Sequence, residues 1–278
     1  MSTRDLFLQS KKYTTKWEKY FDVYDNIFER FRKKKIIFVE VGVLNGESLQ
    51  MWKKYFHPDS RIIGIDFNPE CKKFERDGVE IFIGDQSDEN FWDNFYNKIG
   101  KVDILLDDGG HTNTQQIITT IKSLPNINND GILMIEDTHT SYMREFGNPN
   151  KYSFINFTKE IIDDVNFKYP KIGSPKLTLN NYIYSVQYFE SIVIFHINTK
   201  KTYTNKKIKK NISVEKDAIK DFRYHNSIVQ KLLKNRIVYK FRNLKNYSFF
   251  KLSYGFISYF IIYLKNISDT KKNKKFFK

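Results

Sequence analysis

The sequence predicts a doubly wound α/β fold, in which helices cover both faces of a mostly parallel sheet. Three observations predict it. Short apolar runs without polar alternation recur up to residue 137, stretches able to form helices separate them, and every run ends in an acidic residue. Such runs are typical of parallel strands that are buried on both faces. A chain of 278 residues, 40% of them hydrophobic, can form one domain of this kind together with an appendage.

The elements follow in order along the chain. Apolar residues at helical spacing over 15–33 predict an amphipathic leading helix within residues 1–34. Five strands are expected at 36–41, 61–66, 79–85, 102–108 and 131–137, with helices at 48–56, 87–99 and 113–124. A helix at 151–165 and two strands at 181–189 and 191–197 complete the pattern, and the last two strands would form an antiparallel edge. The full expectation is a seven-stranded, Rossmann-like sheet.

Charge divides the chain into two parts. Of its 47 basic and 32 acidic residues, 22 and four lie in 200–278, which leaves 25 and 28 in 1–199. We therefore expect a near-neutral domain over 1–199 and a basic, helical C-terminal extension over 200–278. A cleft that holds nucleic acid should itself be basic, so nucleic acid is disfavoured as a partner of the first part.

The extension leaves two interpretations open. Its apolar stretch, 249–264, is shorter than the ~20 residues that span a bilayer. A basic amphipathic helix on an anionic membrane is one interpretation, and a helical pair that completes a homo-oligomer is the other. A single cysteine excludes an intramolecular disulfide and no secretory signal is visible, so we expect a cytoplasmic protein, with peripheral contact at the inner membrane face as an option.

A first site motif follows the first strand. Glu40, Gly42, Gly46 and Ser48 lie in one strand-to-helix turn, where glycine permits a tight bend close to a ligand. The middle glycine of a nicotinamide fingerprint is missing. The E-x-G-x-x-x-G form instead resembles the first motif of class I S-adenosylmethionine (SAM) dependent methyltransferases. That resemblance implies that the acid, Glu40, helps to hold the methionine moiety.

The next three strands end in residues that suit the same ligand. Asp66 lies 20 residues after Gly46, where an acid can bind both ribose hydroxyls. By the resemblance, residues such as those ending the third strand bound the adenine. The expected cofactor-binding residues are Glu40, Gly42, Gly46, Ser48, Asp66, Gly84, Asp85, Gln86 and Asp107.

A third group of residues is more specific. The motif Asp107-Asp108-Gly-Gly-His111 is followed by Glu136-Asp137-Thr-His139-Thr-Ser-Tyr142. From about Phe38 to Tyr142, the chain resembles metal-dependent sugar O-methyltransferases of macrolide deoxysugars and cephalosporin hydroxylase-type proteins. The resemblance implies that Asp108, Glu136 and Asp137 bind a divalent cation and that His111 is the catalytic base.

Elementary chemistry agrees with this assignment. Three carboxylates at one rim repel one another unless a cation neutralises them, and oxygen ligands suit Mg²⁺. Asp108 would thereby help to acidify a sugar hydroxyl, and His111, with an ordinary pKa near ~6.5, could accept its proton. A structural alternative is that Asp107 and Asp108 cap the next helix while Glu136 and Asp137 end a strand in solvent.

The sequence thus predicts a Mg²⁺-dependent SAM O-methyltransferase acting on a sugar or glycoside, with bacterial capsular or other surface polysaccharide as the specific pathway. His139 and Tyr142 are expected near the substrate, although His139 could equally be a loop histidine without a role. Two alternatives remain. One is a methyltransferase of another acceptor, such as a phosphoramidate, an amine or nucleic acid, and the other is a non-catalytic SAM-fold module that docks on a membrane or partner.

Overall fold

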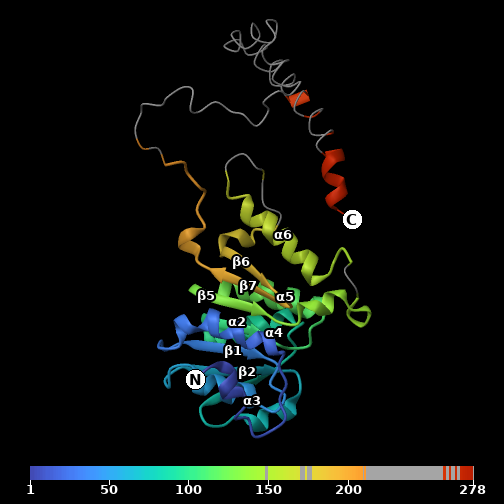
Figure 1. Ribbon diagram of the computed structural model, residues 1–278. Coiled ribbons are helices and arrows are strands. Elements are labelled where there is room, and N and C mark those ends of the chain that lie inside the picture. Colours follow the sequence, from blue (N-terminus) through green and yellow to red (C-terminus); the bar gives the residue numbers. More distant parts are fainter. Residues whose placement is uncertain are drawn as a thin grey trace, which may run out of the picture. The chain divides into compact units, whose positions relative to one another are not determined.

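The computed structural model describes residues 1–147, 150–169, 173, 177–208 and 210, and part of 259–277 (Figure 1). The chain divides into two compact units, Met1–Lys206 and Lys207–Lys278. The helix expected near 213–240, and most of the apolar stretch 249–264, lie outside the described residues. The predicted boundary after residue 199 therefore stays a prediction. None of the helices described is both long enough and apolar enough to cross a bilayer.

A seven-stranded sheet forms the centre of the first unit, in the order β3-β2-β1-β4-β5-β7-β6. The strands are β1 (Ile37–Val41), β2 (Arg61–Asp66), β3 (Val79–Ile83), β4 (Val102–Asp107), β5 (Ile127–Ile135), β6 (Ile183–Phe189) and β7 (Ile192–Ile197). The first five are parallel, and β7 is antiparallel to both β5 and β6. The fold class predicted from the sequence is confirmed, including the antiparallel edge. β5 begins earlier than expected, because Ile127 already pairs with Val102.

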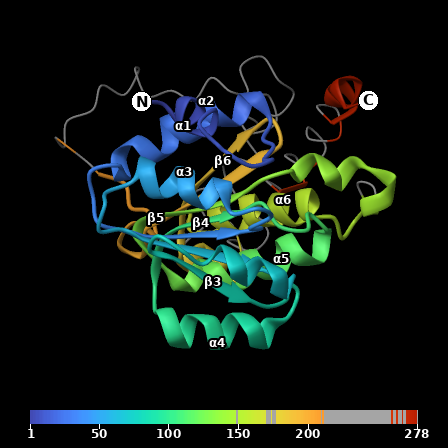
Figure 2. The same cartoon turned by 90° about the horizontal axis from the view of Figure 1, so that it is seen from below.

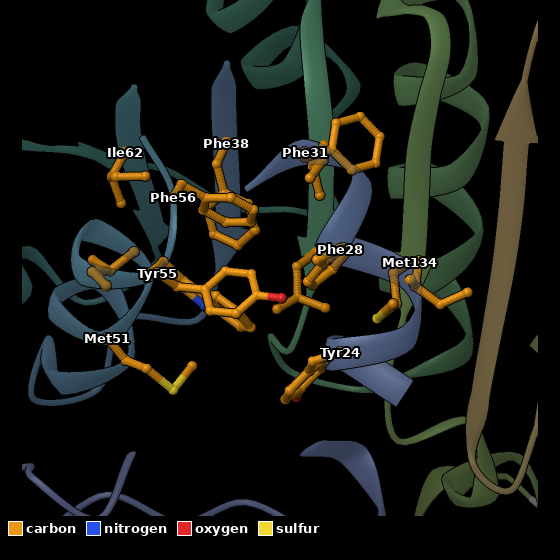
Figure 3. Close-up of a cluster of buried hydrophobic side chains, with 14 of the residues drawn as sticks. Tyr24, Phe28, Phe31, Phe38, Met51, Tyr55, Phe56, Ile62 and Met134 are labelled. Atoms are coloured by element: carbon orange, nitrogen blue, oxygen red, sulfur yellow. The ribbon is translucent and has the colours of Figure 1, made fainter. Parts of the chain in front are cut away.

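Helices cover both faces of the sheet (Figure 2). They are α1 (Thr3–Phe7), α2 (Glu18–Phe28), α3 (Glu47–Tyr55), α4 (Glu89–Ile99), α5 (Asn113–Ser123) and α6 (Phe154–Asn166). On one face, α2 and α3 contribute to an aromatic core in which the ring of Trp52 lies 5.1 Å from the rings of both Tyr24 and Phe38. Figure 3 shows Tyr24, Phe28, Phe38 and Phe56 of this core. A second core, around the buried Trp92 of α4, covers the other face.

The leading helix is shorter than its apolar pattern predicted. α2 begins at Glu18 and continues past Phe28 as a single 3-10 turn, Glu29–Phe31. Trp17, expected on the apolar face, precedes the helix and is 60% exposed. Its indole N–H donates to Asp137, so a polar contact fixes its position instead of burial. The short helix α1 was not expected; its N-terminus is held by a reciprocal capping box between Ser2 and Asp5.

Candidate active site

A cavity of about 560 Å³ lies at the carboxyl ends of the parallel strands. Pairing aligns Val41, at the end of β1, with Ile65 of β2 and Asp107 of β4, so the loops that follow these strands meet at one edge. Nine of the predicted site residues line the cavity: Gly42, Ser48, Asp66, Gly84, Asp85, Gln86, Asp108, His111 and Asp137. Their position is the one that ligands take in doubly wound sheets, beside the point where the strand order reverses.

Gly42 brings two of these loops into direct contact. Its N–H donates to the carbonyl of Ile65 (2.8 Å), and its φ is +95°. A Cβ at this position would lie 2.2 Å from the carbonyl oxygen of Asp108. Both the backbone conformation and the close approach therefore require glycine. Gly46, the N-cap residue of α3, also has a positive φ, +75°, a conformation that favours glycine.

Glu40 and Asp107 lie behind the cavity wall and are not among the residues that line it. Glu40 is fully buried and accepts a hydrogen bond from Ser48 Oγ (2.7 Å). Asp107 accepts from Gln86 Nε2 (3.0 Å) and from the N–H of Gly109 (3.1 Å). Burial raises the pKa of Glu40 to about 7 and also raises the pKa of Asp107. In this structure these two acids hold lining residues in place.

The acids after β2 and β3 do line the cavity, and backbone amides fix their side chains. Asp66 Oδ2 accepts from the N–H of Val43 (2.8 Å), and its Oδ1 accepts from the N–H of Asn68 (2.8 Å). Asp85 accepts from both the N–H and the hydroxyl of Ser87 (2.7 and 2.6 Å). These bonds hold both carboxylates at the cavity, where polar groups of a nucleoside could reach them.

Three side chains of the third motif form a cluster that could hold a metal. Asp108, His111 and Asp137 each offer one ligand atom, and these atoms lie within 4.8 Å of one another. His111 Nε2 is 3.3 Å from Asp137 Oδ2. His111 and Asp137 also have positive φ angles, +57° and +53°, which cost non-glycine residues about 1–3 kcal/mol and are concentrated at functional sites. The two carboxylates suit a divalent cation, and the imidazole beside them can serve either as a further ligand or as a base.

Glu136, the third predicted metal ligand, contacts Tyr24 and Lys16 instead of the residues of this cluster. It is fully buried; one carboxylate oxygen accepts from the hydroxyl of Tyr24 and the other lies 3.0 Å from Lys16 Nζ. Burial raises the pKa of Glu136 to about 8, although the ammonium of Lys16 opposes this shift. A metal-binding role for Glu136 stays a prediction, and it would require Lys16 to release this oxygen.

The structural alternative for these acids is wrong. A capping box of Thr112 and Gln115 begins α5, so neither Asp107 nor Asp108 caps it. Glu136 is fully buried and does not end its strand in solvent.

His139 and Tyr142 lie beside the site, in a second pocket of about 410 Å³. His139 Nδ1 is hydrogen-bonded to Ser191 Oγ, and its ring meets Trp17 edge-on at 5.8 Å. Tyr142 is 56% exposed at this pocket, which Lys159 and Tyr188 also line. His139 Nδ1 lies 3.8 Å from Asp137 Oδ1, so this pocket adjoins the cluster that could hold a metal, and the substrate role of His139 and Tyr142 stays a prediction.

The sequence analysis missed the residues that the leading segment contributes. Tyr20 OH and Trp17 Nε1 both donate to Asp137 Oδ1 (2.6 and 3.1 Å), Tyr24 donates to Glu136, and Lys16 approaches three carboxylates. Tyr20 and Tyr24 carried a signal, because two hydroxyls four residues apart on an otherwise apolar helix face need polar partners. Nothing in the sequence distinguishes Lys16 from the other basic residues.

Comparisons with known proteins confirm the predicted resemblance. No protein-family model matches the chain. Mycinamicin VI 2''-O-methyltransferase of Micromonospora griseorubida is 32% identical over 131 residues, which are 45% of this chain and 32% of the relative. The 8-demethyl-8-(2-methoxy-alpha-L-rhamnosyl)-tetracenomycin-C 3'-O-methyltransferase of Streptomyces olivaceus is 28% identical over 164 residues, 55% of this chain and 42% of the relative. The chain therefore spans less than half the length of these sugar O-methyltransferases.

Comparison with solved structures identifies the fold. The MycE methyltransferase of the mycinamycin biosynthetic pathway, solved in complex with Mg and SAH, matches with a TM-score of 0.65 at 22% identity. The match covers 79% of this chain and 58% of that one. A second crystal form matches with a TM-score of 0.63 at 23% identity, over 71% of this chain and 55% of that one. The chain thus has the Rossmann-like methyltransferase fold that its strand pattern predicted.

Proposed function

We propose that this chain transfers the methyl group of SAM to a sugar hydroxyl with the help of Mg²⁺ or another divalent cation. One observation carries the proposal. A single cavity is lined both by six of the nine residues expected to bind SAM and by Asp108, His111 and Asp137. A methyl donor and a base that share one cavity can act on the same acceptor atom. The sugar O-methyltransferases that the chain resembles support this choice of reaction.

The lining residues suggest how SAM would lie. Asp66 would accept from the ribose hydroxyls, and the segment Gly84–Gln86 would border the adenine. Gly42 and Ser48 would border the methionine moiety, and Glu40 would orient Ser48 through their hydrogen bond. Asp107 would act indirectly, because it holds Gln86 in position through their hydrogen bond.

His111 would be the base. Asp108 and Asp137, joined by Glu136 if Lys16 withdraws, would hold the divalent cation, whose charge makes a nearby hydroxyl easier to deprotonate. His111 Nε2 would accept the hydroxyl proton, and Asp137 Oδ2, 3.3 Å away, would stabilise the imidazolium. Tyr20 and Trp17 would fix Asp137 in that position through their hydrogen bonds to Oδ1.

The test is methyl transfer from labelled SAM to a panel of glycosides. EDTA should abolish turnover and added Mg²⁺ should restore it. Asp108→Ala and His111→Ala should each lose transfer while SAH binding, measured by calorimetry, survives. His57→Ala is the matched control, because His57 is not among the residues that line the cavity. Full activity of His111→Ala would remove His111 as the base, and failure to bind SAM or SAH would favour a non-catalytic docking module.

For the acceptor, we propose a sugar of a bacterial surface polysaccharide such as a capsule. One observation supports a sugar: the second pocket is lined by the aromatic rings of Tyr142 and Tyr188 together with polar side chains, including His139. The basic segment 200–278 supports action near an anionic membrane surface, in a cytoplasmic protein. Flotation with anionic liposomes should recover the full chain but not residues 1–199. Equal recovery of both in the soluble fraction would reject the membrane role and favour oligomer contacts.

A further inference from the structure

Lys16 is a buried cation among the carboxylates of the site. Its side chain is 3% exposed, and its Nζ lies 2.5 Å from Asp108 Oδ2, 3.0 Å from Glu136 Oε2 and 3.6 Å from Glu40 Oε1. A charge buried to this degree is stable only when opposite charges surround it. Lys16 therefore occupies the position from which a cation can contact Asp108 and Glu136 together.

A single ammonium meets several carboxyl groups at this site. Glu40, Asp108 and Glu136 offer three carboxyl groups to one Lys16 ammonium, and Asp137 lies beside them with the neutral donors Trp17 and Tyr20. A divalent cation carries more charge and favours the ionised form of each carboxyl group that it contacts. It would also repel the ammonium, since both would contact the same carboxylates at short range.

Lys16 lies on a segment that forms part of the cofactor cavity. Residues 14–17, which we term the strap, all line the cavity and precede α2. The strap is anchored on both sides: Asn45 Nδ2 donates to the carbonyl of Tyr13 (3.1 Å), and Trp17 Nε1 donates to Asp137 (3.1 Å). Withdrawal of Lys16 must therefore displace a part of the cavity wall.

We propose that Lys16 is a resident cation that a divalent metal ion must displace from Asp108 and Glu136, and that this displacement moves the strap at the cofactor cavity. The inference rests on the proposed function for the presence of the metal ion. Metal binding and the shape of the SAM cavity are then coupled, because one side chain belongs to both.

Lysine labelling of the full chain tests the displacement directly. Reductive dimethylation followed by mass spectrometry should leave Lys16 unmodified without metal and should modify it at a Mg²⁺ concentration that saturates binding in calorimetry. Lys19, 73% exposed, is the internal control and should react in both states. A Lys16 that stays protected at saturation, a Lys16 that reacts without Mg²⁺, or a chain that binds no Mg²⁺ would each overturn the proposal.

Substitution gives an independent readout. Lys16→Met keeps the length of the side chain and removes its charge, so it should bind Mg²⁺ at least about tenfold more tightly than the wild type. Lys16→Arg keeps the charge and should bind no more tightly, and Lys19→Met should match the wild type. Equal or weaker binding by a folded Lys16→Met protein would overturn the proposal.

The two proposals can fail separately. EDTA-sensitive methyl transfer without a change in Mg²⁺ affinity in Lys16→Met would leave the proposed function standing and remove the competing cation. Displacement of Lys16 by Mg²⁺ in a protein that methylates no glycoside would support the displacement of Lys16 and remove the proposed function. Labelling and calorimetry need no turnover, so they remain informative in both cases.

Discussion

Alanine at Gly42 would place a methyl group 2.2 Å from the carbonyl oxygen of Asp108. It would also hold a non-glycine residue at a φ of +95°, which costs about 1–2 kcal/mol. The overlap with backbone adds about 1–3 kcal/mol, as overpacking does in well-packed interiors. We therefore expect Gly42→Ala to lower the free energy of unfolding by about 2–5 kcal/mol. Because Gly42 itself lines the cavity, where it would border the methionine moiety, SAH binding should weaken as well.

Gly78→Ala is the matched control. Gly78 has a similar φ, +78°, but a Cβ there would meet only the end of the flexible Lys53 side chain, at 3.4 Å. It should lose about 1–2 kcal/mol and keep its affinity for SAH. Urea denaturation would measure the two free energies of unfolding, and calorimetry with SAH the two affinities. Equal stability of the two variants, with wild-type SAH binding by Gly42→Ala, would refute the argument from close approach.

Three further predictions concern stability and turnover. Burial raises the pKa of Glu40 to about 7, above its ordinary 4.5, so the stability that Glu40 contributes is present below pH 4.5 and is lost as the pH rises to about 7. Glu40→Gln should therefore flatten the dependence of the free energy of unfolding on pH in this range, measured without metal. An unchanged slope would contradict the pKa shift. Trp92→Ala should cost about 3–5 kcal/mol in thermal or urea unfolding, because this fully buried side chain would leave a cavity. His111→Ala should reduce the rate of methyl transfer about 10²–10⁴-fold, whereas a loss under tenfold would argue against a base at this position.

Much of the fold could be predicted because the strands are buried on both faces, and this burial leaves an apolar run in the sequence. The ends of β1 to β4 could be located in the sequence for the same reason. Nine of the residues that line the cavity could therefore be predicted. Lys16 could not be named. Its partners Asp108 and Glu136 are 92 and 120 residues away, and no local pattern encodes a contact of that range.

Local pattern also misled at one point. The apolar spacing that includes Trp17 is real, but a hydrogen bond to Asp137 holds the indole outside the core. The pairing of acids at the end of β5 predicted that Glu136 and Asp137 bind a metal ion together, and this stays a prediction. In the structure their partners differ, because Tyr24 and Lys16 contact Glu136 whereas Trp17 and Tyr20 donate to Asp137.

The position of α2 has a consequence for how the protein matures. The helix is made early, but its tyrosines bind partners far along the chain: Tyr24 reaches Glu136, 112 residues later, and Tyr20 reaches Ser191, 171 residues later. During synthesis, its apolar face can meet Phe38 and Trp52 long before its hydroxyls find their acceptors. Contacts of such long separation form slowly, since a large loop must close first. Docking of the nascent helix and completion of the site are therefore distinct events, and newly made chains should gain a core before they gain activity.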